Sequence, residues 1–312
     1  MKKYLSSLML LAAAMIWGFA FSAQKSAESV PPFTLGAARS LVAGVFLLLL
    51  IPVFDKLRHT DRRLISKRRI LDFNRRELIG GAICGTVLVT ATFFQQLGMA
   101  SGADASKASF ITALYVVLVP IYALVIKRKA PANVWISVAI AVVGFYFLCI
   151  KNDFSIELAD LIVCACSLIF PIHILAIDHF SPKCDGVRLS CIQFFVGTIV
   201  NAILAIITEM PVNFANVWQN LMPILFLGIM SSGVAYTLQI LGQKGVNPAA
   251  ASIIMSLESV FGVIGAAIVL KEKMSVREYV GAAIVFVAVI LSQLDINAIK
   301  KSIKNKKNAN IS

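Results

Sequence analysis

The chain has 312 residues, of which 59% are hydrophobic and 14% charged, and it combines a mean hydropathy of +0.84 with a formal net charge of +13. This composition lies well outside the range of soluble globular proteins, and the segments between the apolar stretches are too short for a soluble catalytic domain. It indicates a polytopic membrane protein.

Apolar stretches of about 20 residues, the length that crosses about 30 Å of hydrocarbon as an α-helix, recur along the whole chain. We therefore expect an all-α membrane protein with ten transmembrane helices. In chain order they are predicted at Leu5–Ala23, Phe33–Pro52, Leu78–Gly98, Asp104–Ile126, Asn133–Ile150, Glu157–Asp178, Arg188–Thr208, Leu221–Gly242, Asn247–Leu270 and Ser275–Leu294.

An internal repeat relates the two halves of the chain. Segments Gly85–Ile126 and Gly228–Val269 align without a gap at a constant offset of 143 residues, with ten of 42 positions identical. Five predicted spans precede Lys151–Ser155 and five follow it, and an odd number of spans per half gives the two copies opposite orientations. The sequence thus predicts two inverted repeats, 1–150 and 151–296, an arrangement in which secondary transporters hold their substrate site between the halves.

Positive residues are distributed unevenly over the two sides of the expected membrane. With the N-terminus inside, 22 of the 29 Lys and Arg residues fall on the inner side, chiefly in a basic loop at 53–77 and a basic tail at 297–312, and six fall outside. By the positive-inside rule, both termini are expected in the cytoplasm, with the protein in the cell (inner) membrane. Topology accounts for the net charge, so no nucleic acid is expected as a partner.

The sequence lacks the motifs of ATP-driven and catalytic proteins. It contains no P-loop, no nucleophile elbow and no zinc-ligand spacing, and its six cysteines fall mostly within the apolar spans. We therefore expect no enzyme activity, no cofactor and no metal. The expected partners are a small-molecule substrate and the lipid bilayer, and the protein is expected as a monomer or a homodimer.

Several short motifs carry a resemblance to a known family. The motifs are Trp17-Gly18, Arg39, Gly245-Val246-Asn247-Pro248, Ser256-Leu257-Glu258-Ser259-Val260-Phe261, Lys271-Glu272-Lys273-Met274-Ser275 and Gly281. With them the chain resembles the EamA-type members of the drug/metabolite transporter superfamily, as two EamA repeats over about Tyr4–Leu294. The resemblance implies ten helices, both ends cytoplasmic, a central cavity and alternating access, in a family that includes exporters of amino acids and other metabolites.

One position departs from the family pattern. Many relatives carry a proline directly after the ninth-span glutamate, whereas this chain has Ser259 after Glu258. The absence of that proline weakens the expectation of a kink there.

Glu258 is the clearest candidate for chemistry, because an ionisable residue at mid-helix costs about 2.5–3.5 kcal/mol to insert and needs a reason to be there. It is the twelfth of 24 residues in the ninth predicted span, between apolar or small neighbours. A carboxyl that exchanges a proton while facing alternate sides would couple transport to a proton gradient. The alternative is a structural acid, bonded to helix ends or paired with Arg39.

Two further ionisable residues lie within predicted spans. Arg39 lies a third of the way into the second span from its outer end and is a candidate for a structural ion pair. His173 follows Pro171, whose ring frees a backbone carbonyl that a neutral imidazole could bond. A proton relay or a substrate contact is the alternative for His173.

The repeat adds aromatic and amide candidates. Aligned residues of inverted repeats lie on opposite walls of one central volume when they face inward. Trp17 lies deep in the first span rather than at its end, so an interfacial role does not suit it. The aligned candidates are Phe93 with Tyr236, Gln96 with Gln239, and Tyr115 with Glu258.

Together these features predict a secondary transporter of a small metabolite, with an amino-acid or metabolite exporter favoured and proton coupling as a candidate drive. The alternatives are a flippase for a lipid-linked substrate and an intramembrane enzyme. The flippase would need a lateral opening or a long apolar groove. The enzyme would need several converging ionisable residues, and the sequence offers one Glu and one His for that purpose.

Overall fold

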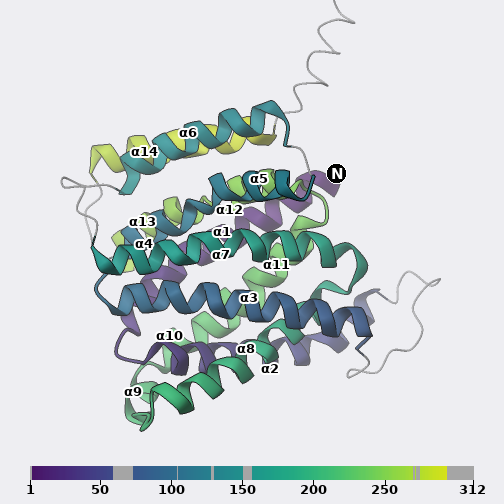
Figure 1. The fold of residues 1–312 in the computed structure, drawn as a ribbon, viewed down its shortest axis with the longest axis vertical. Helices are drawn as coiled ribbons and strands as arrows, with labels where there is room; N and C mark the ends of the chain where they lie inside the picture. Colours follow the sequence, from purple (N-terminus) through teal and green to yellow (C-terminus); the bar gives the residue numbers. More distant parts are fainter. Residues whose placement is uncertain are drawn as a thin grey trace, which may run out of the picture.

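The computed structural model describes residues 2–58, 73–103, 105–127, 130–149, 157–269, 271 and 275–293. Across these segments the chain is helical, with one 3₁₀ turn (η1) and one π-helix (η2), and without β-strands (Figure 1). The elements are α1 (Lys2–Ser26), α2 (Pro32–Arg58), α3 (Arg75–Ala100), α4 (Ala105–Ala113), α5 (Tyr115–Val125), α6 (Ala132–Cys149), α7 (Leu158–Phe180), η1 (Ser181–Lys183), α8 (Gly186–Thr208), α9 (Phe214–Gln219), α10 (Leu221–Phe226), η2 (Leu227–Ala235), α11 (Tyr236–Gln243), α12 (Pro248–Met255), α13 (Glu258–Val269) and α14 (Val276–Gln293).

Eight helical segments among the described residues are long and apolar enough to cross a membrane, so the protein is a multi-pass membrane protein. Ala132–Phe147 is a shorter apolar helix, and α14 lies along it as its partner. These two elements fall where the fifth and tenth spans are predicted, and the count of ten stays a prediction. The tail at 297–312 and most of the loop at 53–77 lie outside the described residues.

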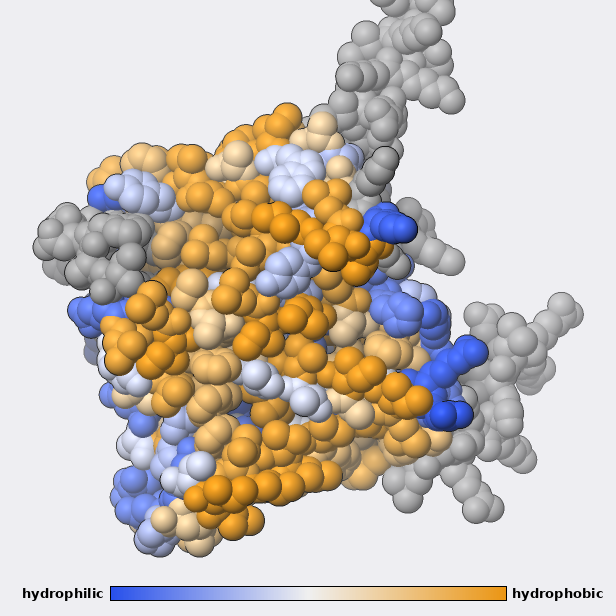
Figure 2. Space-filling view, viewed as in Figure 1, coloured by the Kyte–Doolittle hydropathy of each residue, from blue (hydrophilic) through white to orange (hydrophobic). Residues whose placement is uncertain are grey.

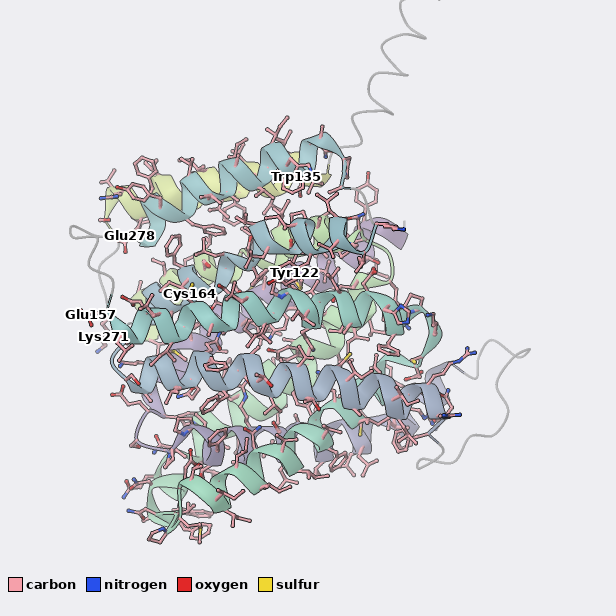
Figure 3. The ribbon with its side chains drawn as sticks, viewed as in Figure 1. Tyr122, Trp135, Glu157, Cys164, Lys271 and Glu278 are labelled. Carbon is pink, nitrogen blue, oxygen red and sulfur yellow. The ribbon has the colours of Figure 1, made fainter. Side chains whose placement is uncertain are left out.

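Polar and apolar residues are separated along the helix axes. The face in Figure 2 shows a broad apolar surface over the middle of the helices, with hydrophilic residues gathered at their ends. Glu157, Lys271 and Glu278 lie at one end of the bundle (Figure 3), whereas the chain begins at the opposite end (Figure 1). The described starts of α7 and α14 are therefore on the same side.

Two of the predicted spans are interrupted at equivalent positions of the repeat. The first break separates α4 from α5 at Leu114, and the second separates α12 from α13 at Ser256–Leu257. Leu114 and Leu257 are aligned residues at the 143-residue offset, so each half has a broken helix at the same point. Tyr115 begins α5 and Glu258 begins α13.

Although the missing proline weakens the expectation of a kink near Ser259, the ninth predicted span is broken at Ser256–Leu257. The break forms without proline because serine and short-range backbone bonds replace the helical ladder. Ser259 N donates to Ser256 O at 3.1 Å, a 3₁₀-type bond, and the Ser256 hydroxyl donates to Ile253 O at 2.8 Å. The Ser259 hydroxyl donates to Ser109 O at 3.0 Å and ties α13 to α4.

The eighth predicted span is also irregular. It is built from α10, the π-helix η2 and α11. A π-helix has wider turns than an α-helix and is found frequently at functional sites. Its equivalent in the first half, residues 84–92, is regular α-helix within α3.

The two halves interlock rather than standing side by side. The most extensive packing pairs α3 with α7, α2 with α8, α6 with α14, α3 with α8 and α1 with α13, and each pair takes one helix from each repeat. At the crossing of α1 and α13, a Cβ on Gly18 would lie 2.3 Å from Phe261 Cβ. The crossing therefore requires glycine at position 18.

Helices α2 and α8 are joined by polar contacts at both ends. At one end, Arg188 Nη1 and Nη2 donate to Asp55 Oδ1 and Oδ2 at 2.9 and 2.7 Å, a bidentate pair. At the other end, Glu209 accepts from the backbone N–H groups of Phe33 and Thr34, both at 2.7 Å. A carboxylate at this place satisfies the free N–H groups at the start of α2 and complements the helix dipole.

Candidate functional site

A cavity lies inside the bundle and is lined by residues of both repeats. It contains about 500 Å³ of space not filled by atoms, part of it open to solvent. Broken helices and the π-helix all contribute to its wall, so the irregular elements of the fold converge there. Its lining residues are Trp17, Ala20, Phe21, Gln24, Arg39, Thr92, Gln95, Thr112, Tyr115, Phe170, His173, Ile174, Ser231, Tyr236, Gln239, Met255 and Glu258.

Glu258 faces Tyr115 in this cavity. The side chain of Glu258 is 6% exposed, and the Tyr115 hydroxyl is hydrogen-bonded to its carboxyl group. Both residues begin a helix directly after a break, and the positive end of a helix dipole favours an acidic residue at that position. The geometry joins the two broken helices through one hydrogen bond.

Three buried acceptor atoms in the cavity have no hydrogen-bond partner among the described residues. They are Glu258 Oε1, Gln239 Oε1 and His173 Nδ1. His173 Nε2 is bonded to Gln193 Oε1 at 3.0 Å, and because that oxygen can only accept, Nε2 carries the proton and Nδ1 is left as an acceptor. Unpaired buried acceptors are costly and rare, so this set is a place where a donor-rich ligand would bind.

Arg39 supplies the opposite charge. Its guanidinium is held by three neutral groups: Nε donates to the Ser232 hydroxyl and Nη2 to the Ser231 hydroxyl, both at 3.1 Å, and Nη1 donates to Gln24 Oε1 at 3.4 Å. Both serines belong to the π-helix η2, which brings consecutive hydroxyls onto one guanidinium. The ion pair considered for Arg39 is not formed: among the described residues, no acid lies within salt-bridge distance of it.

Aromatic rings form the rest of the wall. Trp17 and Tyr236 have ring centroids 4.7 Å apart, and Trp17 Nε1 donates to Ser231 O at 3.2 Å. The Tyr236 phenol interacts electrostatically with both Arg39 and Glu258. Tyr236 therefore shares the cavity wall with both ionisable residues and interacts with each of them.

The cavity brings together seven of the nine residues singled out from the sequence: Trp17, Arg39, Tyr115, His173, Tyr236, Gln239 and Glu258. Gln96 is not among its lining residues. It is buried elsewhere, and its amide nitrogen and oxygen have no partner. Phe93, aligned with Tyr236, also points elsewhere and stacks on Phe33 with centroids 4.2 Å apart. Their functional roles stay predictions.

Several lining residues escaped the sequence reasoning. Gln95 lines the cavity in place of its neighbour Gln96 and donates from Nε2 to the Thr112 hydroxyl at 3.1 Å. The repeat offset pointed to Gln96 because it matches Gln239, whereas Gln95 aligns with Leu238. Ser231 and Ser232 carry no pattern of their own, since small polar residues are common at helix contacts in membranes.

Comparisons with known proteins agree with this architecture. The model of the EamA-like transporter family matches residues 5–150 and 157–294, which are two copies covering nearly the whole chain. The chain belongs to the EamA-like transporter family. A relative from Archaeoglobus fulgidus, described as an uncharacterized transporter, is 30% identical over 295 residues, which are 94% of this chain and 87% of the relative.

Two further similarities extend the comparison. A second uncharacterized transporter, from Methanothermobacter thermautotrophicus, is 22% identical to this chain. The match covers 93% of this chain and 87% of the relative. A solved crystal structure with 16% sequence identity superposes on this chain with a TM-score of 0.71. The match covers 92% of this chain and 96% of the chain in that structure. The structural likeness shows the fold, and family membership with the transporter-named relatives makes this chain a membrane transporter.

Proposed function

We propose that this transporter is a secondary exporter of a small metabolite, an amino acid above all, that works by alternating access in the cell membrane. The observation that carries the proposal is the central cavity. Its wall holds one buried acid, Glu258, and one buried base, Arg39, which are not paired with each other. Charged groups at membrane depth mark substrate and ion pathways, and secondary transporters place such sites at the repeat interface.

The broken helices supply the moving parts of the proposed mechanism. Each repeat contributes one break, at Leu114 and at Ser256–Leu257, directly beside the cavity. A short turn between two helical pieces can absorb the backbone rotation that a continuous helix resists. Tilting α5 and α13 about these turns would move Tyr115 and Glu258 relative to each other and expose the cavity to alternate sides.

Proton coupling runs through Glu258 in this proposal. In the structure its carboxyl keeps the Tyr115 hydrogen bond and leaves Oε1 without a partner among the described residues. A bound proton or the cationic group of a substrate would each satisfy that oxygen, and the two would therefore compete. Export of substrate in exchange for an entering proton follows from that competition.

A proteoliposome assay tests the proposal. Purified protein is reconstituted with each radiolabelled amino acid inside, and efflux is measured with and without an imposed pH gradient. We expect saturable efflux of at least one amino acid, accelerated by an acidic exterior. No flux of any amino acid would contradict the substrate class, and flux that ignores the gradient would contradict proton coupling.

The rival functions are separated by the same preparation. A flippase would instead move a fluorescent lipid-linked substrate between leaflets, which a reduction assay at the outer leaflet detects. An intramembrane enzyme would convert an added substrate to a product with no gradient across the bilayer. The mixed polar lining of the cavity favours a small polar cargo over a lipid-linked one.

A further inference from the structure

Arg39 has more hydrogen-bond donors than its contacts use. A guanidinium carries five N–H groups. Three of them are used on Ser231, Ser232 and Gln24, which leaves one N–H on Nη1 and one on Nη2. The residue is 9% exposed and lines the cavity, so the remaining donors belong to a group that water reaches poorly.

The partners of Arg39 are all neutral. A buried cation is normally paired with an anion, because removing a charge from water is costly unless a counter-charge replaces the solvent. In the described part of the chain, the other buried charge of this cavity is Glu258, and no ion pair joins the two. The site therefore holds a base and an acid, neither of which forms an ion pair with another described residue, and both interact electrostatically with Tyr236.

The acid side shows the complementary deficiency. Glu258 Oε1, Gln239 Oε1 and His173 Nδ1 are acceptors without donors, and all three residues are at least nine-tenths buried. An ammonium group has three N–H donors and one positive charge. An ammonium group would donate hydrogen bonds to these three acceptors, just as a carboxylate would accept hydrogen bonds from Arg39.

We propose that Arg39, held by Ser231 and Ser232 of η2, binds the carboxylate of the substrate while Glu258, Gln239 and His173 bind its ammonium group, so that the cargo is a zwitterion. This inference rests on the proposed export function and adds the recognition chemistry. The π-helix is the device that makes the carboxylate site, because it directs both serine hydroxyls at Arg39. A planar bidentate guanidinium suits a carboxylate better than the point charge of lysine does.

The first test is ligand-dependent thermal stabilisation of the purified full-length protein in detergent, since a ligand that binds the native state raises its melting temperature. Each amino acid that stabilises the wild type is compared with its carboxamide, which lacks the carboxylate, and with its N-acetyl form, which lacks the ammonium. We expect both derivatives to bind at least about tenfold more weakly than the parent.

The variants assign each charge to its residue. Arg39→Gln is expected to bind the free acid and the carboxamide equally, while Glu258→Gln keeps the preference for the free carboxylate and loses the preference for the free ammonium. Arg39→Lys should recover part of the carboxylate preference. The matched control is Arg76→Gln, an arginine at the exposed start of α3, which should bind as the wild type does.

The outcomes separate this proposal from the proposed function. If an amino acid is transported and Arg39→Gln still prefers the free acid to the carboxamide, the Arg39 assignment is wrong and the export function stands. If no amino acid is transported but acetate or inorganic phosphate stabilises the wild type and not Arg39→Gln, the anion site stands and the cargo is another anion. If no carboxylate or phosphate stabilises the wild type, the proposal is overturned.

Discussion

Tyr115 and Glu258 occupy equivalent positions of the two repeats, each as the first residue after a helix break, and their side chains are hydrogen-bonded in the central cavity. The contact crosses from one repeat to the other at the point where both helices are interrupted. Any movement that separates α5 from α13 must break it. The pair therefore reports on opening of the cavity as well as on the state of the acid.

Replacing Glu258 tests its role as the proton-carrying group. Glu258→Gln keeps the shape of the side chain but cannot release a proton, so transport should no longer respond to an imposed pH gradient. Tyr115→Phe should keep the response and displace the pH profile, because the phenol interacts differently with the charged and neutral acid. Proteoliposome flux over a pH series measures both. Gradient-dependent transport by Glu258→Gln at the wild-type rate would make Glu258 a structural acid.

Removing one partner of the Arg188–Asp55 pair should destabilise the fold. Arg188 is 3% exposed and Asp55 19% exposed, so either substitution leaves a poorly hydrated charge. We expect Arg188→Gln to cost about 3 kcal/mol, seen as a lower melting temperature in detergent. The control is Lys25→Gln, which breaks the more exposed Lys25–Glu28 pair and should cost less than about 1 kcal/mol. Equal losses for the two variants would contradict a structural role for the buried pair.

A side chain at Gly18 should force α1 and α13 apart. The added Cβ would lie 2.3 Å from Phe261 Cβ and 2.6 Å from the Phe261 backbone carbon, which cannot move aside alone. Gly18→Ala is expected to cost about 1–3 kcal/mol through overpacking. Gly265→Ala serves as the control at the same interface, since its nearest contact would be Phe19 Cδ1 at 3.3 Å. Thermal unfolding of both variants checks the difference.

Cys184, between the spans, should react slowly with maleimides at neutral pH. Burial, and next the negative charge of Glu77, raise the pKa of its thiol, while Lys244 opposes them. Because the thiolate is the reactive form, labelling should accelerate at a higher pH than for a free thiol. Glu77→Gln should lower the pKa and speed labelling at pH 8, and Lys244→Gln should slow it. Mass spectrometry of the labelled peptide measures both, and shifts in one direction would refute the electrostatic cause.

The orientation of the chain is open to direct measurement. The charge distribution predicts that the basic loop and the C-terminus share the cytoplasmic side. Reporter fusions at Arg69 and Ser312 should both give the cytoplasmic signal. A fusion at Lys151, between the two repeats, is the control and should give the opposite one. An external signal from either of the first two would contradict the arrangement of ten spans in two inverted repeats.

Much of the helical layout could be predicted from hydropathy, because a bilayer requires long apolar helices. The eight segments that qualify as spans overlap eight of the predicted ones, and the cavity collects nearly all of the residues chosen for their charge, ring or amide. An ionisable or aromatic residue in the middle of a membrane span usually faces the protein interior or a cavity. Glu258 was found for this reason, whereas Tyr236 was chosen because the repeat aligns it with Phe93.

The irregular backbone could not be predicted in the same way. Hydropathy does not distinguish a π-turn from an α-turn. The sequence therefore does not predict that the Ser231 and Ser232 hydroxyls both accept a hydrogen bond from Arg39. The repeat, in contrast, predicted a similarity between the halves that the structure does not have. It pairs Gln96 with Gln239, but the two halves differ locally, since η2 has no equivalent in α3 and Gln95 takes the cavity position.

The contacts that join α2 to α8 also bear on how the protein is made. Asp55 is synthesised 133 residues before Arg188. The separation in sequence between the first N–H groups of α2 and Glu209 is still larger. During that interval Asp55 lacks the contact with Arg188, and the first turn of α2 lacks the Glu209 carboxylate that caps it in the folded protein. The first half is therefore not a finished domain when its translation ends. Expressed separately, the two halves should accumulate only when they are produced together.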